Sequence, residues 1–164
     1  MTSLALMSLP AALQSIRTRP LFVMQLEVKG PVVVGPTPGA SRRVGIITGG
    51  RFEGERLSGT VLDGGNDWQT EHTDGATGLD VRVLLRTTDD ALITMTYRGL
   101  RHGPKDVMAR LAKGEAVDPA AYYFRISPLF ETAAPQYAWL NNVLAVGTGH
   151  RLPDGPVYSL FEVL

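Results

Sequence analysis

Residues 47–69, ITGGRFEGERLSGTVLDGGNDWQ, distinguish a nucleotide-binding fold from an all-β fold. The stretch holds six glycines, at positions 49, 50, 54, 59, 64 and 65. Glycine-rich loops bind phosphate groups in nucleotide enzymes, and glycines also serve where a β-chain turns or bends sharply. The spacing of the glycines and the elements around them therefore separate a nucleotide-binding protein from a β-structure.

The glycine spacing matches neither nucleotide-binding motif. A P-loop has the pattern GxxxxGK[ST], because its lysine must reach the phosphates that the backbone amides hold. The nearest match, GERLSGT at residues 54–60, has no lysine. A dinucleotide fingerprint stands between a strand and a long helix, and no helical pattern follows this region. We therefore interpret Gly49-Gly50 and Gly64-Gly65 as tight turns, and Gly54 and Gly59 as residues that let a barrel strand coil.

Short segments of alternating apolar and polar residues lie on both sides of this stretch. In residues 21–28, LFVMQLEV, the alternation stops at Gly30-Pro31. Asp-Gly and Asp-Asp pairs separate many of the segments, and these residues tolerate the positive φ of hairpin turns. An all-β chain is predicted, a closed antiparallel barrel of about eight strands. The predicted strands are 21–28, 43–48, 54–62, 67–73, 78–87, 91–99, 122–127, 137–147 and 157–163.

One segment departs from the strand pattern. PKDVMARLAKG, at residues 104–114, starts with proline, ends in Lys-Gly and places Val107, Met108 and Leu111 on one face. These features predict a short helix over 104–113 that covers or plugs one end of the barrel. Residues 10–17 predict a further short helix. We therefore expect an N-terminal extension, 1–19, followed by a single β-barrel domain, 20–164.

The composition excludes several classes of protein. Sixteen basic and sixteen acidic residues give a net charge of +0 without a run of like charge, so nucleic-acid binding is not expected. The absence of Cys removes thiol nucleophiles, disulfides and thiolate metal sites. No segment approaches the roughly 20 apolar residues of a membrane span, and the N-terminus lacks the basic region of a signal peptide. We expect a cytoplasmic protein with no membrane contact.

The sequence also argues against a metal site and a hydrolase triad. His72, His102 and His150 form no HxH or HExxH pair, so zinc or iron is not expected. Ser58 lies in GERLSGT rather than in GxSxG. We therefore expect neither a metal nor a cofactor.

Six blocks of the chain resemble those of the DUF3237 (UPF0311) family of uncharacterised proteins. In order they are ITGGRFEG, LSGTVLDGGNDW, LDVRVLLRT, YRGLRHGP, YYFRISPLFET and YAWLNNVLAVGTG. The resemblance covers residues 20–164 and departs slightly from the family pattern at 43–47 and at Val83. It implies the closed antiparallel barrel, with an internal cavity, of allene-oxide-cyclase-like proteins. By analogy alone it also implies cyclase or isomerase chemistry in that cavity.

Asp67 is a candidate for acid/base chemistry, since it follows a double-glycine turn and precedes Trp68. An acid held against an aromatic wall is desolvated, which raises its pKa and makes it usable as a general acid or base near neutral pH. The alternatives are a turn-capping aspartate and a tryptophan in the core or in an oligomer interface. Asp80 and Arg82 share one face of their strand, and they either face solvent or project into a ligand cavity.

Arginines and aromatic residues supply the remaining candidates. Arg98 and Arg125 suit a substrate carboxylate or enolate oxygen, because a guanidinium group binds such oxygens with two hydrogen bonds. Arg125 could instead form a structural ion pair with Glu131 or another acid. The predicted strand 137–147 offers hydroxyl, indole and amide donors on one face, a composition that suits either a small-molecule pocket or a homo-oligomer interface.

These residues predict a cofactor-free small-molecule enzyme, an isomerase, cyclase or lyase that moves a proton next to a carbonyl in the barrel cavity. The alternatives are a protein that binds an apolar metabolite without chemistry, and a structural or oligomeric module with a filled barrel. The catalytic candidates are Glu131, Asp67 and Arg125, with Glu131 and Asp67 as alternative acid/base groups. The substrate-binding candidates are Trp68, Asp80, Arg82, Arg98, Tyr123, Tyr137, Trp139 and Asn141.

Overall fold

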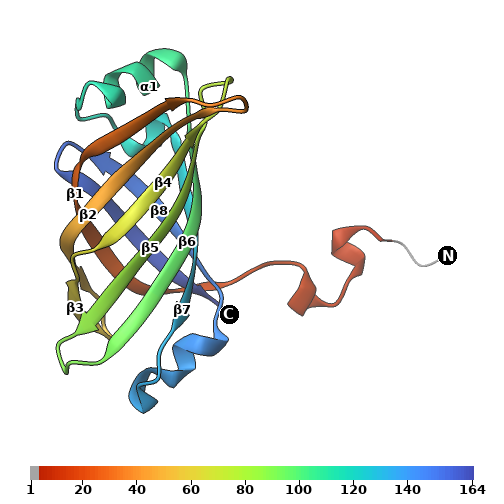
Figure 1. Cartoon of the computed structure of the whole chain (residues 1–164). Coiled ribbons are helices and arrows are strands. Elements are labelled where there is room, and N and C mark those ends of the chain that lie inside the picture. The colour runs from red at the N-terminus through yellow and green to blue at the C-terminus, as the bar shows by residue number, and fades with distance from the viewer. Residues whose placement is uncertain (1–3) are drawn as a thin grey trace.

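Nine antiparallel strands form one continuous sheet in the computed structural model, which describes residues 4–164. The predicted all-β fold class is confirmed (Figure 1). The strands are β1 (Thr18–Pro36), β2 (Ser41–Glu53), β3 (Ser58–Val61), β4 (Gly65–Glu71), β5 (Thr77–Thr87), β6 (Leu92–His102), β7 (Tyr123–Glu131), β8 (Ala145–Leu152) and β9 (Gly155–Val163).

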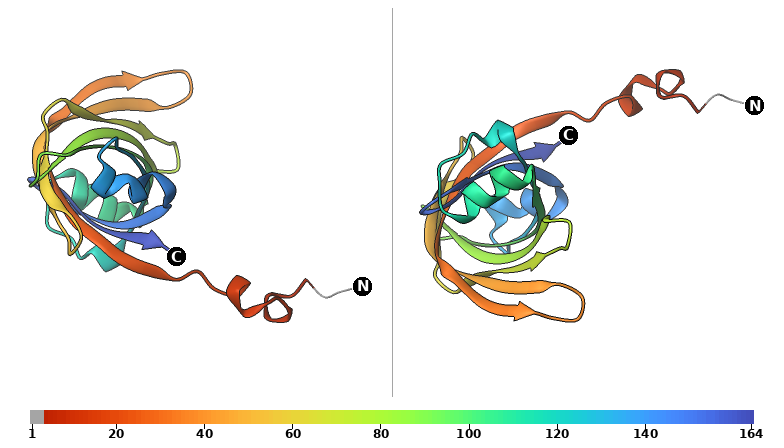
Figure 2. Two further views of the ribbon diagram at one scale, coloured as in Figure 1. Left: turned by 90° about the horizontal axis from the view of Figure 1, so that it is seen from below. Right: turned by 90° about the horizontal axis from the view of Figure 1, so that it is seen from above.

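The strand pairings run all the way round a ring. They follow the order β1, β9, β8, β7, β6, β5, β4 and β2, and β2 pairs back with β1. The short β3 lies between the same two neighbours as β4, because β2 pairs with β4 through residues 41–47 and with β3 through 50–53. Figure 2 shows the ring from its two ends.

The barrel interior is filled over much of its length by alternate side chains of each strand. On β5, Leu79, Val81, Val83 and Leu85 are buried, whereas the polar residues between them are exposed. Successive side chains of a strand point to opposite faces, so this alternation places the apolar set inside. Full burial of such a side chain stabilises the fold by roughly 1.5–3 kcal/mol.

Helical segments cover the two ends of the barrel (Figures 1 and 2). The predicted helix is confirmed as α1 (Lys105–Ala112), which lies across one end and buries Val107 and Leu111. It ends before Gly114, whose φ of +77° is the left-handed backbone conformation in which glycine often terminates a helix. The 3-10 helix η4 (Pro135–Asn142) lies at the other end and buries Leu140.

Among the predicted strands whose limits differ from the structure, two differ for a clear local reason. Residues 137–147 do not form one strand, because η4 occupies 135–142 and β8 begins only at Ala145. The Asn141 amide accepts a hydrogen bond from the Thr132 backbone N–H (2.8 Å) and donates one to the Thr132 carbonyl (3.0 Å), which holds this segment back against β7. Conversely, β1 continues past Gly30-Pro31, since its pairing with β2 shifts register between residues 29 and 32 and so accommodates the proline.

The glycines of residues 47–69 serve the backbone in two ways. Gly64 has a φ of +102° and makes the turn between β3 and β4. At Gly59 a Cβ atom would lie 2.0 Å from the backbone oxygen of Arg86, so only glycine permits this close approach of β3 to β5. Gly49 and Gly50 lie inside β2, where its pairing changes from β4 to β3, and not in a tight turn.

The segment before β1 runs away from the barrel (Figures 1 and 2). It contains two single 3-10 turns, η1 (Leu6–Ser8) and η2 (Ala11–Leu13), and neither has a buried residue. The helix predicted over residues 10–17 is thus reduced to η2. No helix among residues 4–164 is long and apolar enough to cross a membrane.

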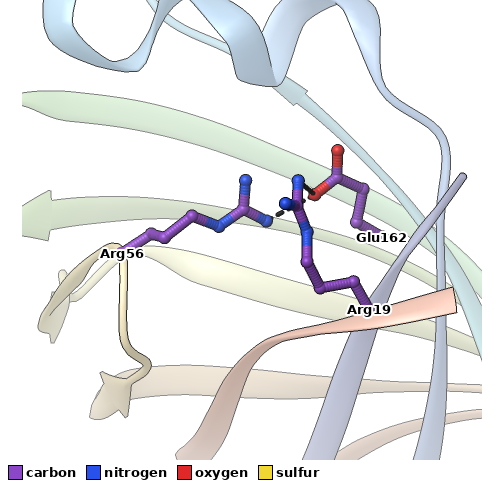
Figure 3. Close-up of polar contacts among 3 residues, drawn as sticks. All are labelled: Arg19, Arg56 and Glu162. Atoms are coloured by element: carbon purple, nitrogen blue, oxygen red, sulfur yellow. Dashed lines mark hydrogen bonds and ion pairs between the residues drawn. The ribbon is translucent and has the colours of Figure 1, made fainter.

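A buried carboxylate joins the first and last strands near the η4 end. Glu162 of β9 accepts a hydrogen bond from Arg19 of β1 (2.8 Å), and Arg56, between β2 and β3, binds the same carboxylate oxygen (Figure 3). The Arg56 guanidinium also lies 4.0 Å from the ring centre of Trp139. The hydrogen bonds from Arg19 and Arg56 hold the pKa of Glu162 below its usual value. We call Glu162, Arg19 and Arg56 the strand clasp.

Candidate active site

A cavity of about 260 Å³ lies inside the barrel at its α1 end. Apolar residues such as Leu26, Ile47, Leu79, Leu111 and Phe124 form much of its wall. A few charged and polar side chains converge on it from several strands, which is the usual composition of a small-molecule site. They are Arg43 (β2), Asp67, Gln69 and Glu71 (β4), Thr77 (β5), Tyr97 and Arg101 (β6), Arg151 (β8) and Tyr158 (β9).

Strand alternation points Asp67 of this set inward. On β4, Gly65 and Asp67 are buried, and Trp68 is exposed. On β6, Tyr97 and Arg101 continue the buried series that starts with apolar residues at 93 and 95. Asp67 and Arg101 are therefore held on rigid strands, which fix a site more firmly than loops do.

Asp67 is 8% exposed, and only one of its two carboxyl oxygens has a hydrogen-bond partner. Its Oδ2 accepts a hydrogen bond of 2.6 Å from the Gln69 amide, whereas its Oδ1 has no partner. Burial raises the pKa of Asp67 from 3.8 to about 6, although the Gln69 hydrogen bond and the charges of Arg101 and Arg43 oppose that rise. A carboxyl group with this pKa can both give and take a proton near neutral pH.

A hydrogen-bonded chain orients the Gln69 amide. The Arg43 Nε donates to the Gln69 oxygen (2.6 Å), and the Arg43 Nη1 pairs with Glu71 (2.8 Å). Since the amide oxygen faces Arg43, the amide nitrogen is left to donate to Asp67. This chain keeps Oδ2 of Asp67 occupied and leaves Oδ1 free.

Arg101 is the second buried charged group in the cavity, at 7% exposure. Its Nε has no hydrogen-bond partner, and no ion pair joins its guanidinium to an acid among residues 4–164. The guanidinium carbon lies 5.5 Å from the ring centre of Phe124. Burial lowers the pKa of Arg101, but an arginine stays charged at physiological pH.

Two tyrosines complete the polar part of the wall. The ring centres of Tyr97 and Tyr158 are 5.5 Å apart in an edge-to-face arrangement, and Tyr158 makes a similar contact with Phe124 at 5.4 Å. Burial raises the pKa of both tyrosines, so their hydroxyl groups remain protonated. They can donate hydrogen bonds to a bound oxygen.

Most of the residues singled out from the sequence lie outside this cavity. Trp68 is 58% exposed and donates a hydrogen bond to Asn66 (2.8 Å), because its neighbour Asp67 takes the inward position. Asp80 and Arg82 are exposed on the outer face of β5, so they face solvent rather than a ligand. The aromatic wall beside Asp67 is made by Tyr97, Phe124 and Tyr158 instead, none of which is among the candidates predicted from the sequence.

The predicted arginine pair lies on the outer surface. Arg98, Tyr123 and Arg125 line a separate groove over β6, β7 and β8 together with Leu100 and Val146. The Arg125 Nη1 donates to the Phe124 carbonyl (2.9 Å), and its guanidinium carbon lies 5.0 Å from the Tyr123 ring centre. Neither arginine reaches the cavity that holds Asp67.

The remaining candidates lie at the other end of the barrel or outside it. Glu131 is exposed at the end of β7. On η4, the Tyr137 hydroxyl donates to Asp89 (2.9 Å), Trp139 lies against Arg56, and Asn141 is hydrogen-bonded to the Thr132 backbone. The structure therefore separates these side chains instead of bringing them into one constellation.

The cavity also contains functional candidates that the sequence patterns do not single out, among them Arg43, Tyr97, Arg101 and Tyr158. Arg101 carries a usable signal, since it lies in phase with the apolar positions of β6. A charged residue on the buried face of a strand needs a partner or a ligand. Among residues 4–164, no three His, Asp or Glu side chains gather where they could hold a metal ion.

Comparisons with known proteins identify relatives in bacteria and in a fungus. A UPF0311 protein of Clostridium acetobutylicum is 35% identical over 144 residues, which cover 87% of this chain and 91% of that protein. The crystal structure of a conserved protein of unknown function from Rhodopseudomonas palustris superposes with a TM-score of 0.89, at 33% identity over 92% of this chain and 99% of the other.

An enzyme is also among the relatives. The hydroalkoxylation enzyme phnH of Penicillium herquei is 31% identical over 127 residues, 77% of this chain and 70% of that protein. The crystal structure of an enzyme from the same fungus superposes with a TM-score of 0.70, at 25% identity over 91% of this chain and 95% of the other. The family model DUF3237, described as a protein of unknown function, matches residues 16–163, and the chain therefore belongs to this family.

Proposed function

We propose that the protein is a small-molecule enzyme, an isomerase, cyclase or lyase that moves a proton next to a carbonyl without a cofactor. The observation that carries this proposal is the Oδ1 atom of Asp67. It is buried in a cavity and has no partner, and the carboxyl group titrates close to neutral pH because its pKa is raised to about 6. A bound substrate would supply the missing partner.

Five polar groups of the cavity have a role in this scheme. Asp67 Oδ1 takes a proton from the substrate or gives one to it. The Arg101 guanidinium and the protonated hydroxyls of Tyr97 and Tyr158 stabilise negative charge that develops on a substrate oxygen. Gln69 is a positioning residue, because its hydrogen bond fixes the carboxyl group of Asp67.

The Penicillium relative supports the general class of reaction. Hydroalkoxylation adds an O–H group across a carbon–carbon double bond, so one proton leaves an oxygen and one arrives at a carbon. When both groups belong to one molecule, the product is a cyclic isomer of the substrate. Transfers of this kind need an acid/base group and stabilisation of an oxyanion, and Asp67 and Arg101 would provide these functions.

The alternative function, binding of an apolar metabolite without chemistry, has less support. An apolar ligand would leave Asp67 Oδ1 and Arg101 Nε buried without partners, and each unsatisfied group costs roughly 1–3 kcal/mol. A ligand with polar atoms facing these two groups would remove that cost.

Deuterium transfer to carbon tests the proposal even with an unidentified substrate. Wild-type protein, Asp67→Asn and Glu131→Gln are incubated with a metabolite extract of the native host in D2O, and the products are analysed by mass spectrometry after return to H2O. We expect wild-type protein to consume a compound and form a product that retains carbon-bound deuterium. Asp67→Asn should slow this conversion by roughly 10²–10⁴-fold.

The Glu131→Gln variant decides between the two carboxyl groups considered from the sequence. Its conversion rate should match that of wild-type protein, because Glu131 lies outside the cavity. Loss of conversion in Glu131→Gln with full conversion in Asp67→Asn would reverse the assignment. Full conversion in both variants would rule out either carboxyl group as the acid/base.

A further inference from the structure

One of the three arginines that line the cavity has no partner for its charge in the part of the chain that the structure describes. Arg43 is paired with Glu71, and the Arg151 Nη1 donates to the backbone carbonyl of Leu152. Arg101 has neither an ion pair nor a hydrogen bond at its Nε, although it is the most deeply buried of the three arginines. The cavity therefore holds a buried cation that no acid among residues 4–164 pairs with.

Asp67 is not the missing partner of Arg101. A carboxylate in contact with a guanidinium has a depressed pKa, because the cation favours the ionised form. The pKa of Asp67 is instead raised, with burial as the largest cause and Arg101 as a smaller opposing one. The two groups lie in one cavity but more than 4.0 Å apart, since no ion pair joins them.

We propose that the ligand of this cavity is a small planar organic anion, which binds Arg101 through its charged oxygen while Asp67 holds a proton. This inference rests on the site described under Proposed function and adds the chemical class of its substrate. A conjugated carboxylate or an enolate carries charge on a planar group, which the fork of a guanidinium matches. The rings of Phe124, Tyr97 and Tyr158 provide flat walls for the rest of such a molecule.

Under this proposal, binding of the anion is coupled to uptake of a proton by Asp67. A bound anion is a like charge for Asp67 and raises the pKa of that carboxyl further, so a carboxyl group that is largely ionised at pH 7 takes up a proton when the anion binds. The other charged and titratable groups that face the cavity are Arg43 from β2, Glu71 from β4, Tyr97 and Arg101 from β6, Arg151 from β8 and Tyr158 from β9.

Matched pairs of probes test the charge requirement. Benzoate and benzamide, and 2-naphthoate and 2-naphthamide, have similar shapes and differ in charge. Isothermal titration calorimetry at pH 6 should show that at least one anion binds wild-type protein roughly tenfold or more tightly than its neutral amide. At pH 7 the heat of binding should vary with the ionisation enthalpy of the buffer, which reports proton uptake.

Variants assign the charge and the proton to residues. Arg101→Gln should abolish the preference for the anion, and Arg101→Lys should retain part of it. Asp67→Asn should still bind the anion but without proton uptake at pH 7. Arg86→Gln, on the exposed face of β5, is the matched control and should bind like wild-type protein. Circular dichroism checks that each variant is folded.

Several outcomes would overturn the proposal. They are equal binding of anion and amide, failure of both anions to bind at millimolar concentration, and an anion preference that survives in Arg101→Gln. The test is independent of the proposed acid/base role. Suppose that wild-type protein prefers the anion and that the Asp67→Asn variant still converts substrate. This result would refute the role of Asp67 as the acid/base and would support the ligand class. If anion and amide bind equally well but the Asp67→Asn variant no longer converts substrate, the ligand class alone is refuted.

Discussion

Asp67 on β4 and Arg101 on β6 line the same cavity, each more than nine-tenths buried, without an ion pair or a hydrogen bond between them. Opposite charges that fold into one interior normally meet, since contact offsets part of their loss of hydration. Here Asp67 accepts a hydrogen bond from Gln69 instead. The arrangement lowers stability and leaves two functional groups free for a ligand.

Replacing Arg101 by Met should therefore increase the stability of the free protein. The variant removes a buried charge without an ion-pair partner and keeps an unbranched side chain of similar length. We expect the free energy of unfolding to rise by about 1 kcal/mol, which corresponds to roughly 2–4 °C in Tm for a chain of this size. Calorimetry at pH 7 measures the change, and Arg86→Met on the exposed face of β5 is the control. A fall in Tm specific to Arg101→Met would mean that the arginine holds the fold together.

The contribution of Asp67 to the stability of the wild-type protein should fall as pH rises from about 4 to 6. Asp67 titrates at about 6 in the folded protein against an ordinary value of 3.8, so between these values the folded state binds a proton that the unfolded state has released. The loss amounts to about 3 kcal/mol at most and is complete above pH 6. Asp67→Asn lacks this titration.

Denaturation of the Asp67→Asn variant isolates this contribution. As pH rises from 4 to 8, the free energy of unfolding of wild-type protein should fall relative to that of Asp67→Asn. Urea unfolding at both pH values gives this difference. A difference that does not change with pH would show that the Asp67 carboxyl keeps an ordinary pKa in the folded protein.

The strand clasp should contribute to stability with the opposite dependence on pH. Glu162 has a lowered pKa in the folded protein, so its contribution is complete above its usual value of 4.5 and is lost as pH falls through the folded value. Glu162→Gln should destabilise the protein by about 1 kcal/mol at pH 7, a modest amount because Arg19 and Arg56 are partly exposed.

Unfolding experiments at pH 7 and at pH 3 test the clasp. The effect of Glu162→Gln should shrink at pH 3, and Glu53→Gln, an exposed acid at the end of β2, should have little effect at either pH. An equal loss of stability at both pH values would attribute the effect to packing instead of charge.

Gly59 should tolerate alanine far less well than Gly49. At Gly59 the new methyl group would lie 2.0 Å from a backbone oxygen, so β3 and β5 must separate, at a cost of roughly 1–3 kcal/mol. At Gly49 the nearest atom is 3.1 Å away and belongs to the flexible side chain of Glu27. Gly49→Ala should change stability by less than about 0.5 kcal/mol. Equal effects in urea unfolding would contradict this explanation of the glycines.

The fold was largely predictable because its signals are local. Alternation marked most strands, and Pro104 and Gly114 marked the limits of the helix, since each acts on its own stretch of backbone. The strand predicted over residues 137–147 was wrong because the side chain of Asn141 bonds back to Thr132, a contact that periodicity does not report.

The site was less predictable because it depends on which face of each strand is buried. The sequence predicts both Asp67 and its neighbour Trp68 for one pocket, although adjacent residues of a strand point in opposite directions. Arg101 was missed because β6 continues past Gly99, the residue at which the predicted strand ended. Convergence of Asp67, Arg101 and Tyr158 depends on closure of the barrel, which brings distant strands to one cavity.

The central claim is that Asp67 can exchange a proton with a bound molecule near neutral pH. Its most direct test is a titration of the Asp67 side-chain carboxyl carbon by ¹³C NMR, with the resonance assigned by its absence in Asp67→Asn. We predict a midpoint near 6 in the free protein and a higher one in Arg101→Met, because that variant removes the cation that opposes the rise. A midpoint at or below about 4 in wild-type protein would contradict the claim, since Asp67 would then be an ordinary hydrated carboxylate.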